Sequence, residues 1–199
     1  MKITVIAGSQ RPGSQSEKVA RYLTARLRAL DCDVDVLTIH DLGLSAMMGE
    51  VWSDEAQQEL VSDVKTRLAA AEGYLIVTPE WHGMASPGLK NMLLHVGTTM
   101  AHKAAMLVGV SATYGGSYPL AEIRSAVSKN TRICFVPEQI IIRKVKTVLN
   151  DDVDESNDAD AYLRDRIEWA LPILLEYTKA LAPVRESGVT ESEAYDFGM

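Results

Sequence analysis

The sequence predicts an α/β fold in which a five-stranded parallel sheet is covered by helices on both faces. Three observations support this prediction. Short apolar runs alternate five times with longer segments of helical periodicity along the 199 residues. The apolar runs are nearly continuous, which is typical of strands buried on both faces of a parallel sheet. No internal repeat or linker interrupts the alternation, and the length suits one domain.

The first strand is expected at residues 3–7, where an apolar run rich in β-branched residues comes before a glycine. A helix should follow, because Ser14 and Glu17 are spaced as a capping box and apolar residues then recur at helical intervals up to Leu30. Residues 34–39 predict the second strand.

The second helix is expected to be capped by Ser53, with the acidic residues Asp54 and Glu55 in its first turn. Its apolar stripe ends near Gly73, which we expect to terminate the helix. A third strand should follow immediately, over residues 74–78.

Ser86 and Pro87 have the pattern of an N-cap followed by proline at the first helical position, which predicts the third helix. The fully apolar run at residues 104–110 predicts the fourth strand. Pro119 should then open the fourth helix.

The fifth strand is expected at residues 133–136, with residues 140–142 extending it past Pro137. A final helix follows an acidic loop. We therefore expect one domain over residues 1–183 and a polar C-terminal tail over residues 184–199.

Charge is unevenly distributed along the chain. The formal net charge is −7. Residues 150–199 hold 13 acidic and 4 basic side chains, whereas residues 1–149 hold 14 acidic and 16 basic ones. The acidic balance argues against nucleic-acid binding, which normally needs a basic face. The acidic loop at residues 150–160 is expected to be a solvated surface, with a cation-binding loop as the alternative.

Composition indicates an ordinary globular protein, since 47% of the residues are apolar and 24% are charged. Cys32 and Cys134 form no metal-binding or redox motif, and we expect both to be buried, reduced thiols. The N-terminal apolar run is too short for a signal peptide or a membrane span. These features predict a soluble, cytoplasmic protein that does not enter a membrane.

The loop after the first strand has the composition of an anion site. It carries three hydroxyl groups and one guanidinium where a helix begins, and the unpaired N–H groups of a helix N-terminus favour anions. It lacks the patterns of a nucleotide P-loop or of a dinucleotide fold, which indicates a single terminal phosphate. The alternative is an ordinary polar turn with a helix cap. The candidate residues are Ser9, Gln10, Arg11, Ser14 and Ser16.

This loop resembles the GSxRxxSxN loop of the NADPH-dependent FMN reductase family, with Ser16 in the place of the usual Asn. The resemblance implies a flavodoxin-like fold and a loop that binds the FMN phosphate. It covers roughly residues 1–180 and is strongest in the first two loops.

The loop after the third strand resembles the family's P-E-Y-H-G-x-x-S-x-x-L-K-N segment without a gap. The resemblance implies that this loop surrounds the flavin ring, largely through backbone amides, and that His82 lies near the flavin edge or the substrate. Surface-loop and solvated-helix roles are the alternatives for His82 and Lys90. The residues that we expect to contact the cofactor here are Pro79, Glu80, Trp81, His82 and Gly83.

The loop after the fourth strand resembles the family's S-x-G-x-x-G-G element, with Thr113 in the usual glycine position. Glycines here let the backbone approach a planar ligand. The expected function is a second wall of the flavin pocket, and the alternative is a tight turn. The candidate residues are Ser111, Tyr114, Gly115 and Gly116.

The resemblance implies an FMN-dependent oxidoreductase that passes hydride from NADPH or NADH through FMN to a small acceptor, such as a flavin, a quinone, an azo compound or a metal ion. No catalytic side chain is expected, because a flavin carries the chemistry. No metal site is predicted from the histidines. The family implies a homodimer or homotetramer. A flavodoxin-type electron carrier and a non-catalytic FMN- or phosphate-binding module are the alternatives.

Overall fold

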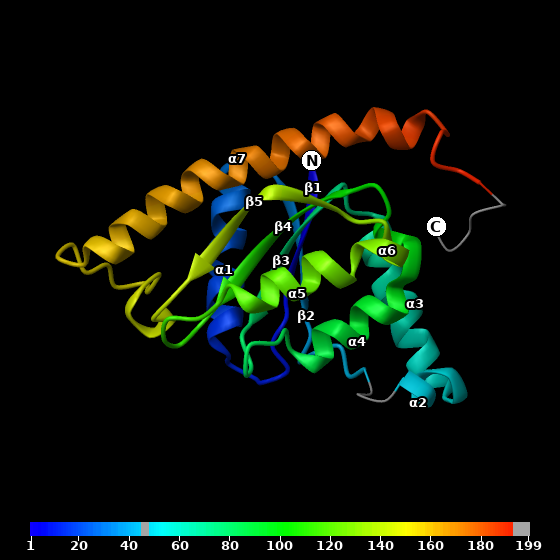
Figure 1. Ribbon diagram of the computed structural model, residues 1–199, viewed down its shortest axis with the longest axis horizontal. Helices are drawn as coiled ribbons and strands as arrows, with labels where there is room; N and C mark the ends of the chain where they lie inside the picture. The colour runs from blue at the N-terminus through cyan, green and yellow to red at the C-terminus, as the bar shows by residue number, and fades with distance from the viewer. Residues whose placement is uncertain (45–47, 193–199) are drawn as a thin grey trace.

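A five-stranded, entirely parallel sheet forms the centre of the protein, as the sequence predicts (Figure 1). The computed structural model describes residues 1–44 and 48–192. The strand order is β2-β1-β3-β4-β5, so β1, β3 and β4 are neighbours. The strands are β1 (Lys2–Ala7), β2 (Asp33–Thr38), β3 (Gly73–Pro79), β4 (Ala104–Val110) and β5 (Cys134–Ile142).

Helices cover both faces of the sheet. α1 and α7 pack on one face, and α3, α4 and α5 pack on the other. α7 runs along the top of Figure 1 for most of the length of the molecule. The short helices α2 and α6 were not predicted, because one or two turns give too few residues for a periodic pattern. The helices are α1 (Gln15–Ala29), α2 (Met48–Ser53), α3 (Glu55–Ala69), α4 (Pro87–Val96), α5 (Tyr118–Ala126), α6 (Ser128–Thr131) and α7 (Asp158–Glu186).

Two apolar cores lie on opposite sides of the sheet. Every residue of β3 and β4 is buried, which explains their continuous apolar sequences. Alternate residues of each strand point to opposite faces, so Leu75 packs toward α1 and α7 while Ile76 packs toward α3, α4 and α5.

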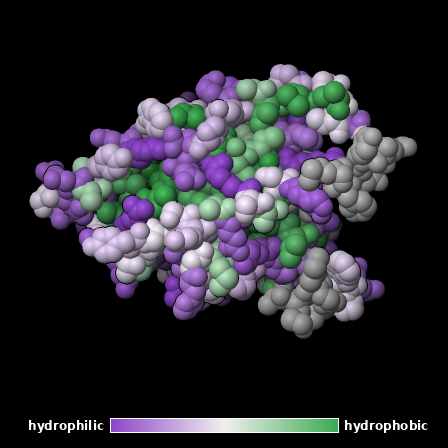
Figure 2. All heavy atoms as spheres, viewed as in Figure 1, coloured by the Kyte–Doolittle hydropathy of each residue, from purple (hydrophilic) through white to green (hydrophobic). Residues whose placement is uncertain are grey.

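β5 is an edge strand and is less buried than its neighbours. It continues past Pro137 as one strand, as predicted, and the register with β4 shifts between Ala105 and Leu107. A proline lacks the N–H that a ladder needs, so it fits an edge strand or an irregular position. Hydrophobic atoms are visible beside this edge, between α7 and the helices below it (Figure 2).

Two predicted helix boundaries are wrong. Asp54, not Ser53, is the N-cap of α3, and its carboxylate accepts hydrogen bonds from Ala56 N and Gln57 N at 2.9 and 3.4 Å. A carboxylate is favoured there by the helix dipole. Gly73 does not terminate α3 but begins β3, where a Cβ would lie 2.5 Å from Thr178 Oγ1 of α7.

Two further details differ from prediction, one at the end of α7 and one at a cysteine. α7 continues to Glu186, so the first residues of the expected tail are helical. Cys134 is half-buried, whereas Cys32 is buried as expected, and both thiols are free. No helix among the described residues is long and apolar enough to cross a membrane.

The acidic loop uses several of its oxygen atoms in internal contacts. Asp154 accepts from Ser156 N and Oγ at 3.0 and 2.6 Å, and Asp160 is buried beside Arg164 with a 2.8 Å ion pair. Within residues 1–44 and 48–192, no three His, Cys, Asp or Glu side chains are arranged to hold a metal ion. The other acidic side chains of this loop are exposed.

Candidate functional site

The three predicted loops meet at the carboxyl edge of the sheet, because they follow the neighbouring parallel strands β1, β3 and β4. Backbone hydrogen bonds connect them in pairs. Gly8 N donates to Val77 O at 2.8 Å, and Glu80 N donates to Val110 O at 3.0 Å. The arrowhead of β5 in Figure 1 points toward this edge, at the lower left of the view.

The first loop places buried hydroxyl groups around the N-terminus of α1. Ser9, Ser14 and Ser16 are each at most 9% exposed. Ser14 caps α1 by accepting from Glu17 N at 3.2 Å, as the sequence predicts, and Ser9 Oγ accepts from Arg11 N at 3.2 Å. The helix N-terminus supplies unpaired N–H groups that favour an anion.

Two glutamine side chains, one in this loop and one at the start of α1, have unsatisfied oxygen atoms. Oε1 of Gln10 and Oε1 of Gln15 are both buried, and neither has a hydrogen-bond partner. A buried, unpaired amide oxygen is costly. The first loop therefore suits a ligand that brings hydroxyl donors together with a negative charge.

The second loop forms a tight turn beyond β3. Trp81 and Met84 exchange backbone hydrogen bonds of 2.9 Å in each direction. The two residues between them, His82 and Gly83, have φ angles of 51° and 81°, which is typical of a type I′ turn. His82 is exposed at the tip of this turn, and no contact with residues 1–44 or 48–192 gives it a role.

The first and second loops also contact each other through side chains. The guanidinium of Arg11 lies 5.8 Å from the centroid of the Trp81 ring, within the range of a cation–π contact. Ser86, the N-cap of α4, donates its hydroxyl proton to Gly8 O. The phosphate loop expected from the sequence and the start of α4 are therefore one packed unit.

The third loop folds back onto β4 and is connected to the second loop by Glu80. Gly116 has a φ of 102°, and its N–H donates to the Glu80 carboxylate. A Cβ at Gly115 would lie 2.7 Å from both Glu80 oxygens, and a Cβ at Gly109 would lie 2.0 Å from Gly116 O. Close contact with backbone thus explains the glycine at position 109, and the positive φ explains the glycine at position 116. Tyr114, by contrast, is 72% exposed.

Glu122 of α5 connects the second loop to the helices behind it. Its carboxylate accepts from Ala85 N at 2.6 Å and pairs with Lys90 of α4 at 2.9 Å. Partial burial acts to raise the pKa of Glu122, but these two hydrogen bonds and the charge of Lys90 outweigh it, and the pKa lies below its ordinary value. Lys90 is therefore an ion-paired residue whose side chain stays partly exposed.

The predicted site residues lie in the three loops at this edge, except Ser16 in the first turn of α1 and Pro79 at the end of β3. Contacts join the first loop to the second and the second to the third. Sequence reasoning missed Glu122, because it lies 37 positions from Ala85. It also missed Arg143 and Lys144, which follow β5 and contact the third loop. Nothing local in the sequence separates these three residues from other surface charges.

Comparison with known proteins gives a consistent picture. A family model described as NADPH-dependent FMN reductase matches residues 1–147. An FMN-dependent NADPH-azoreductase of Staphylococcus haemolyticus is 29% identical over 168 residues, which cover 83% of this chain and 86% of that protein. The enzyme of the same name from Staphylococcus aureus is 29% identical over 171 residues, which cover 84% of this chain and 90% of that protein.

Solved structures share the fold at low identity. An NADH:FMN oxidoreductase in its apo form superposes with a TM-score of 0.68 at 17% identity, covering 91% of this chain and 90% of that one. The flavoenzyme NAD(P)H:(acceptor) oxidoreductase of Paracoccus denitrificans gives a TM-score of 0.69 at 17% identity. The match covers 90% of this chain and 97% of that one.

Proposed function

Because the chain belongs to the NADPH-dependent FMN reductase family and is an FMN-dependent NAD(P)H oxidoreductase, we propose that its three loops bind FMN and that it reduces an aromatic acceptor of the azo or quinone class. The observation that carries the proposal is the joining of an anion site at α1 to two glycine-containing loops at one edge of the sheet. The relatives named as azoreductases support the choice of acceptor.

The first loop fits the phosphate and ribityl parts of FMN. The N-terminus of α1 and Arg11 suit a dianionic phosphate, since guanidinium groups bind phosphate oxygens through paired hydrogen bonds. The unsatisfied Oε1 atoms of Gln10 and Gln15 suit hydroxyl donors. Ser9, Ser14 and Ser16 supply further hydrogen bonds from buried positions.

The second and third loops fit the two sides of a planar ring. Pro79, Glu80, Trp81, His82 and Gly83 would lie along one edge of the ring, and Ser111, Tyr114, Gly115 and Gly116 along the other. Backbone N–H groups in such loops stabilise negative charge on a reduced ring. When bound, FMN supplies the redox chemistry, accepting hydride from NAD(P)H and passing electrons to the acceptor.

The side chains around this edge would position the acceptor. Met84, Tyr114 and Tyr118 are 49%, 72% and 70% exposed, and they belong to the second loop, the third loop and the start of α5. Exposed aromatic and thioether groups favour flat, apolar molecules over small polar ones. The same exposed groups also support a homodimer or homotetramer in which a second subunit borders the site. We further propose that the protein acts in the cytoplasm.

The test is the absorption spectrum of the purified protein together with NADPH oxidation. The protein should bind added FMN at micromolar concentrations, and the rate of NADPH oxidation should rise when an azo dye or a quinone is present. A protein that binds FMN but does not oxidise NADPH would be an electron carrier, and failure to bind FMN would overturn the proposal altogether.

A further inference from the structure

The loop that follows β5 forms a continuous surface with the third loop. Ser111 N donates to Ile142 O at 2.8 Å, and Val145 N donates back to Ser111 O at 3.1 Å. Lys144 N donates to Thr113 O at 2.9 Å. Residues 143–149 therefore border the candidate FMN site next to the third loop, on the side away from the phosphate-binding loop.

Two exposed cations lie on this extension, and we call Arg143 and Lys144 the cationic rim. Arg143 Nε donates to Gly115 O at 3.3 Å, and Lys144 Nζ lies 4.7 Å from the centroid of the exposed Tyr114 ring. Among the described residues, neither member of the rim forms an ion pair with a carboxylate. The rim thus combines two unneutralised cations with an accessible aromatic face.

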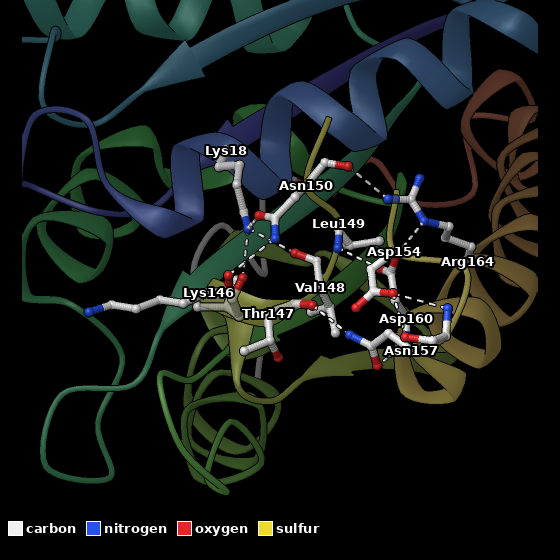
Figure 3. Close-up of polar contacts among 12 residues, drawn as sticks. Lys18, Lys146, Thr147, Val148, Leu149, Asn150, Asp154, Asn157, Asp160 and Arg164 are labelled. Carbon is white, nitrogen blue, oxygen red and sulfur yellow. Dashed lines mark hydrogen bonds and ion pairs between the residues drawn. The ribbon is translucent and has the colours of Figure 1, made fainter. Parts of the chain in front are cut away.

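The backbone that carries the rim is held in one conformation. Lys144 and Leu149 have φ angles of 47° and 54°, which non-glycine residues adopt only where surrounding contacts enforce it. Lys18 of α1 supplies such contacts, because its ammonium donates to Val145 O at 2.6 Å, to Val148 O at 2.8 Å and to Asn150 Oδ1 at 2.8 Å (Figure 3).

α7 and the segment before it complete this support from the other side. Asp160 Oδ1 accepts from Leu149 N at 2.6 Å, Asn157 Nδ2 donates to Thr147 O at 2.8 Å, and Arg164 donates to Asn150 O at 2.9 Å (Figure 3). A loop fixed by side chains from two helices presents its cations with little loss of conformational entropy on binding.

The position of the rim excludes the FMN phosphate as its ligand. β5 is separated from β1 by three strand spacings, or about 14 Å. The phosphate-binding loop follows β1, so the rim lies on the far side of the ring from that phosphate. The other phosphate-bearing reactant of the proposed reaction is the dinucleotide, whose adenosine half offers a planar base and phosphate groups.

We propose that Arg143, Lys144 and Tyr114 bind the adenosine half of NADPH, with the two cations on the 2′-phosphate and the tyrosine ring against the adenine. This assignment rests on the proposed function. It makes the rim the determinant of the preference for NADPH over NADH, because only NADPH carries the 2′-phosphate. A guanidinium and an ammonium together suit a phosphate dianion.

The experiment compares Arg143→Gln, Lys144→Gln and the double variant with the wild type. Lys129→Gln is the matched control, because Lys129 is an exposed lysine on α6, which precedes the amino end of β5. The ratio of kcat/KM for NADPH to that for NADH should fall about tenfold in each single variant, as expected for a lost charged hydrogen bond. The control should keep the wild-type ratio.

Direct binding gives a second readout that needs no turnover. Isothermal titration of the FMN-loaded protein with adenosine 2′,5′-bisphosphate and with AMP should show tighter binding of the bisphosphate, and the double variant should lose that difference. Circular dichroism melting of each variant checks that it is folded.

Three results would overturn the assignment. The first is that the variants retain the wild-type ratio. The second is that the wild type does not distinguish the two adenosine phosphates. The third is an equal loss of kcat/KM for NADPH and for NADH, which would place the pyrophosphate on the rim instead. A wild-type protein that binds no FMN is a different failure, because it would reject the proposed function and not the rim alone.

Discussion

The backbone N–H of Gly116 donates a hydrogen bond to the side-chain carboxylate of Glu80, joining the loops that follow β4 and β3. The two loops come from adjacent strands, and this contact fixes their separation beyond the point where the strand ladder ends. The carboxylate also lies against Gly115, so a side chain at that position would require Glu80 to shift.

Replacing Glu80 should loosen both loops. We expect Glu80→Ala to lower the free energy of unfolding by about 1–3 kcal/mol, since a partly buried N–H loses a charged acceptor. FMN binding should weaken in parallel, because the ring site is no longer preformed. Urea unfolding and fluorescence titration with FMN measure the two effects. Glu59→Gln, on the exposed side of α3, should change neither, and equal effects in both variants would contradict the role of Glu80.

Removing the Arg11 guanidinium should weaken FMN binding by about 1.5–3 kcal/mol, if its hydrogen bonds to the phosphate have typical strength. Riboflavin, which lacks the phosphate, is the matched control ligand. Arg11→Ala should affect riboflavin much less than FMN in a fluorescence titration. A similar loss for both ligands would instead assign Arg11 to the ring, through its contact with Trp81.

The pH dependence of stability should include a contribution from Glu122. The folded pKa of this carboxyl is lowered, so the unfolded chain binds its proton more readily, and the stabilisation is present above the unfolded pKa of about 4.5. It is lost as the pH falls through the folded pKa. The difference in unfolding free energy between the wild type and Glu122→Gln should therefore shrink below about pH 4.5.

Lys90→Met tests the cause of this effect. Without the ammonium, the pKa of Glu122 should move upward, and the pH at which the stabilisation is lost should rise. Urea unfolding at several pH values gives both comparisons. A Lys90→Met variant with an unchanged pH profile would show that the hydrogen bond from Ala85 N alone controls the carboxyl.

Gly109→Ala should destabilise the protein although it adds a single methyl group. A Cβ there would lie 2.0 Å from Gly116 O, so either β4 or the third loop must move. Overpacking of this kind typically costs about 1–3 kcal/mol. Thermal melting measures the loss. Gly13→Ala is a useful comparison, because nothing lies within 4 Å of a Cβ there and only its φ of 59° is unfavourable.

The sheet and its main helices could be predicted because each signal is local. The continuous apolar sequence of β3 and β4 reports their burial on both faces, and Ser14 and Ser86 cap helices where their spacing indicates. The boundary at Ser53 was wrong because a serine next to an aspartate offers two possible caps. Gly73 was misassigned because its reason, the close approach of Thr178, is more than a hundred residues away.

The candidate site was predictable only as far as its three loops. The motifs place Ser9, Arg11 and Gly116 on loops that parallel strands bring to one edge. The contacts that join those loops, from Glu80 to Gly116 and from Glu122 to Ala85, depend on side-chain positions that no spacing in the sequence encodes.

Lys18 also has a consequence for how the protein responds to its solution. Its ammonium donates hydrogen bonds to three oxygen atoms of the loop after β5. This cation is covalently attached, so its local concentration does not depend on the medium. The loop after β5 should therefore keep its shape whichever monovalent salt surrounds the protein.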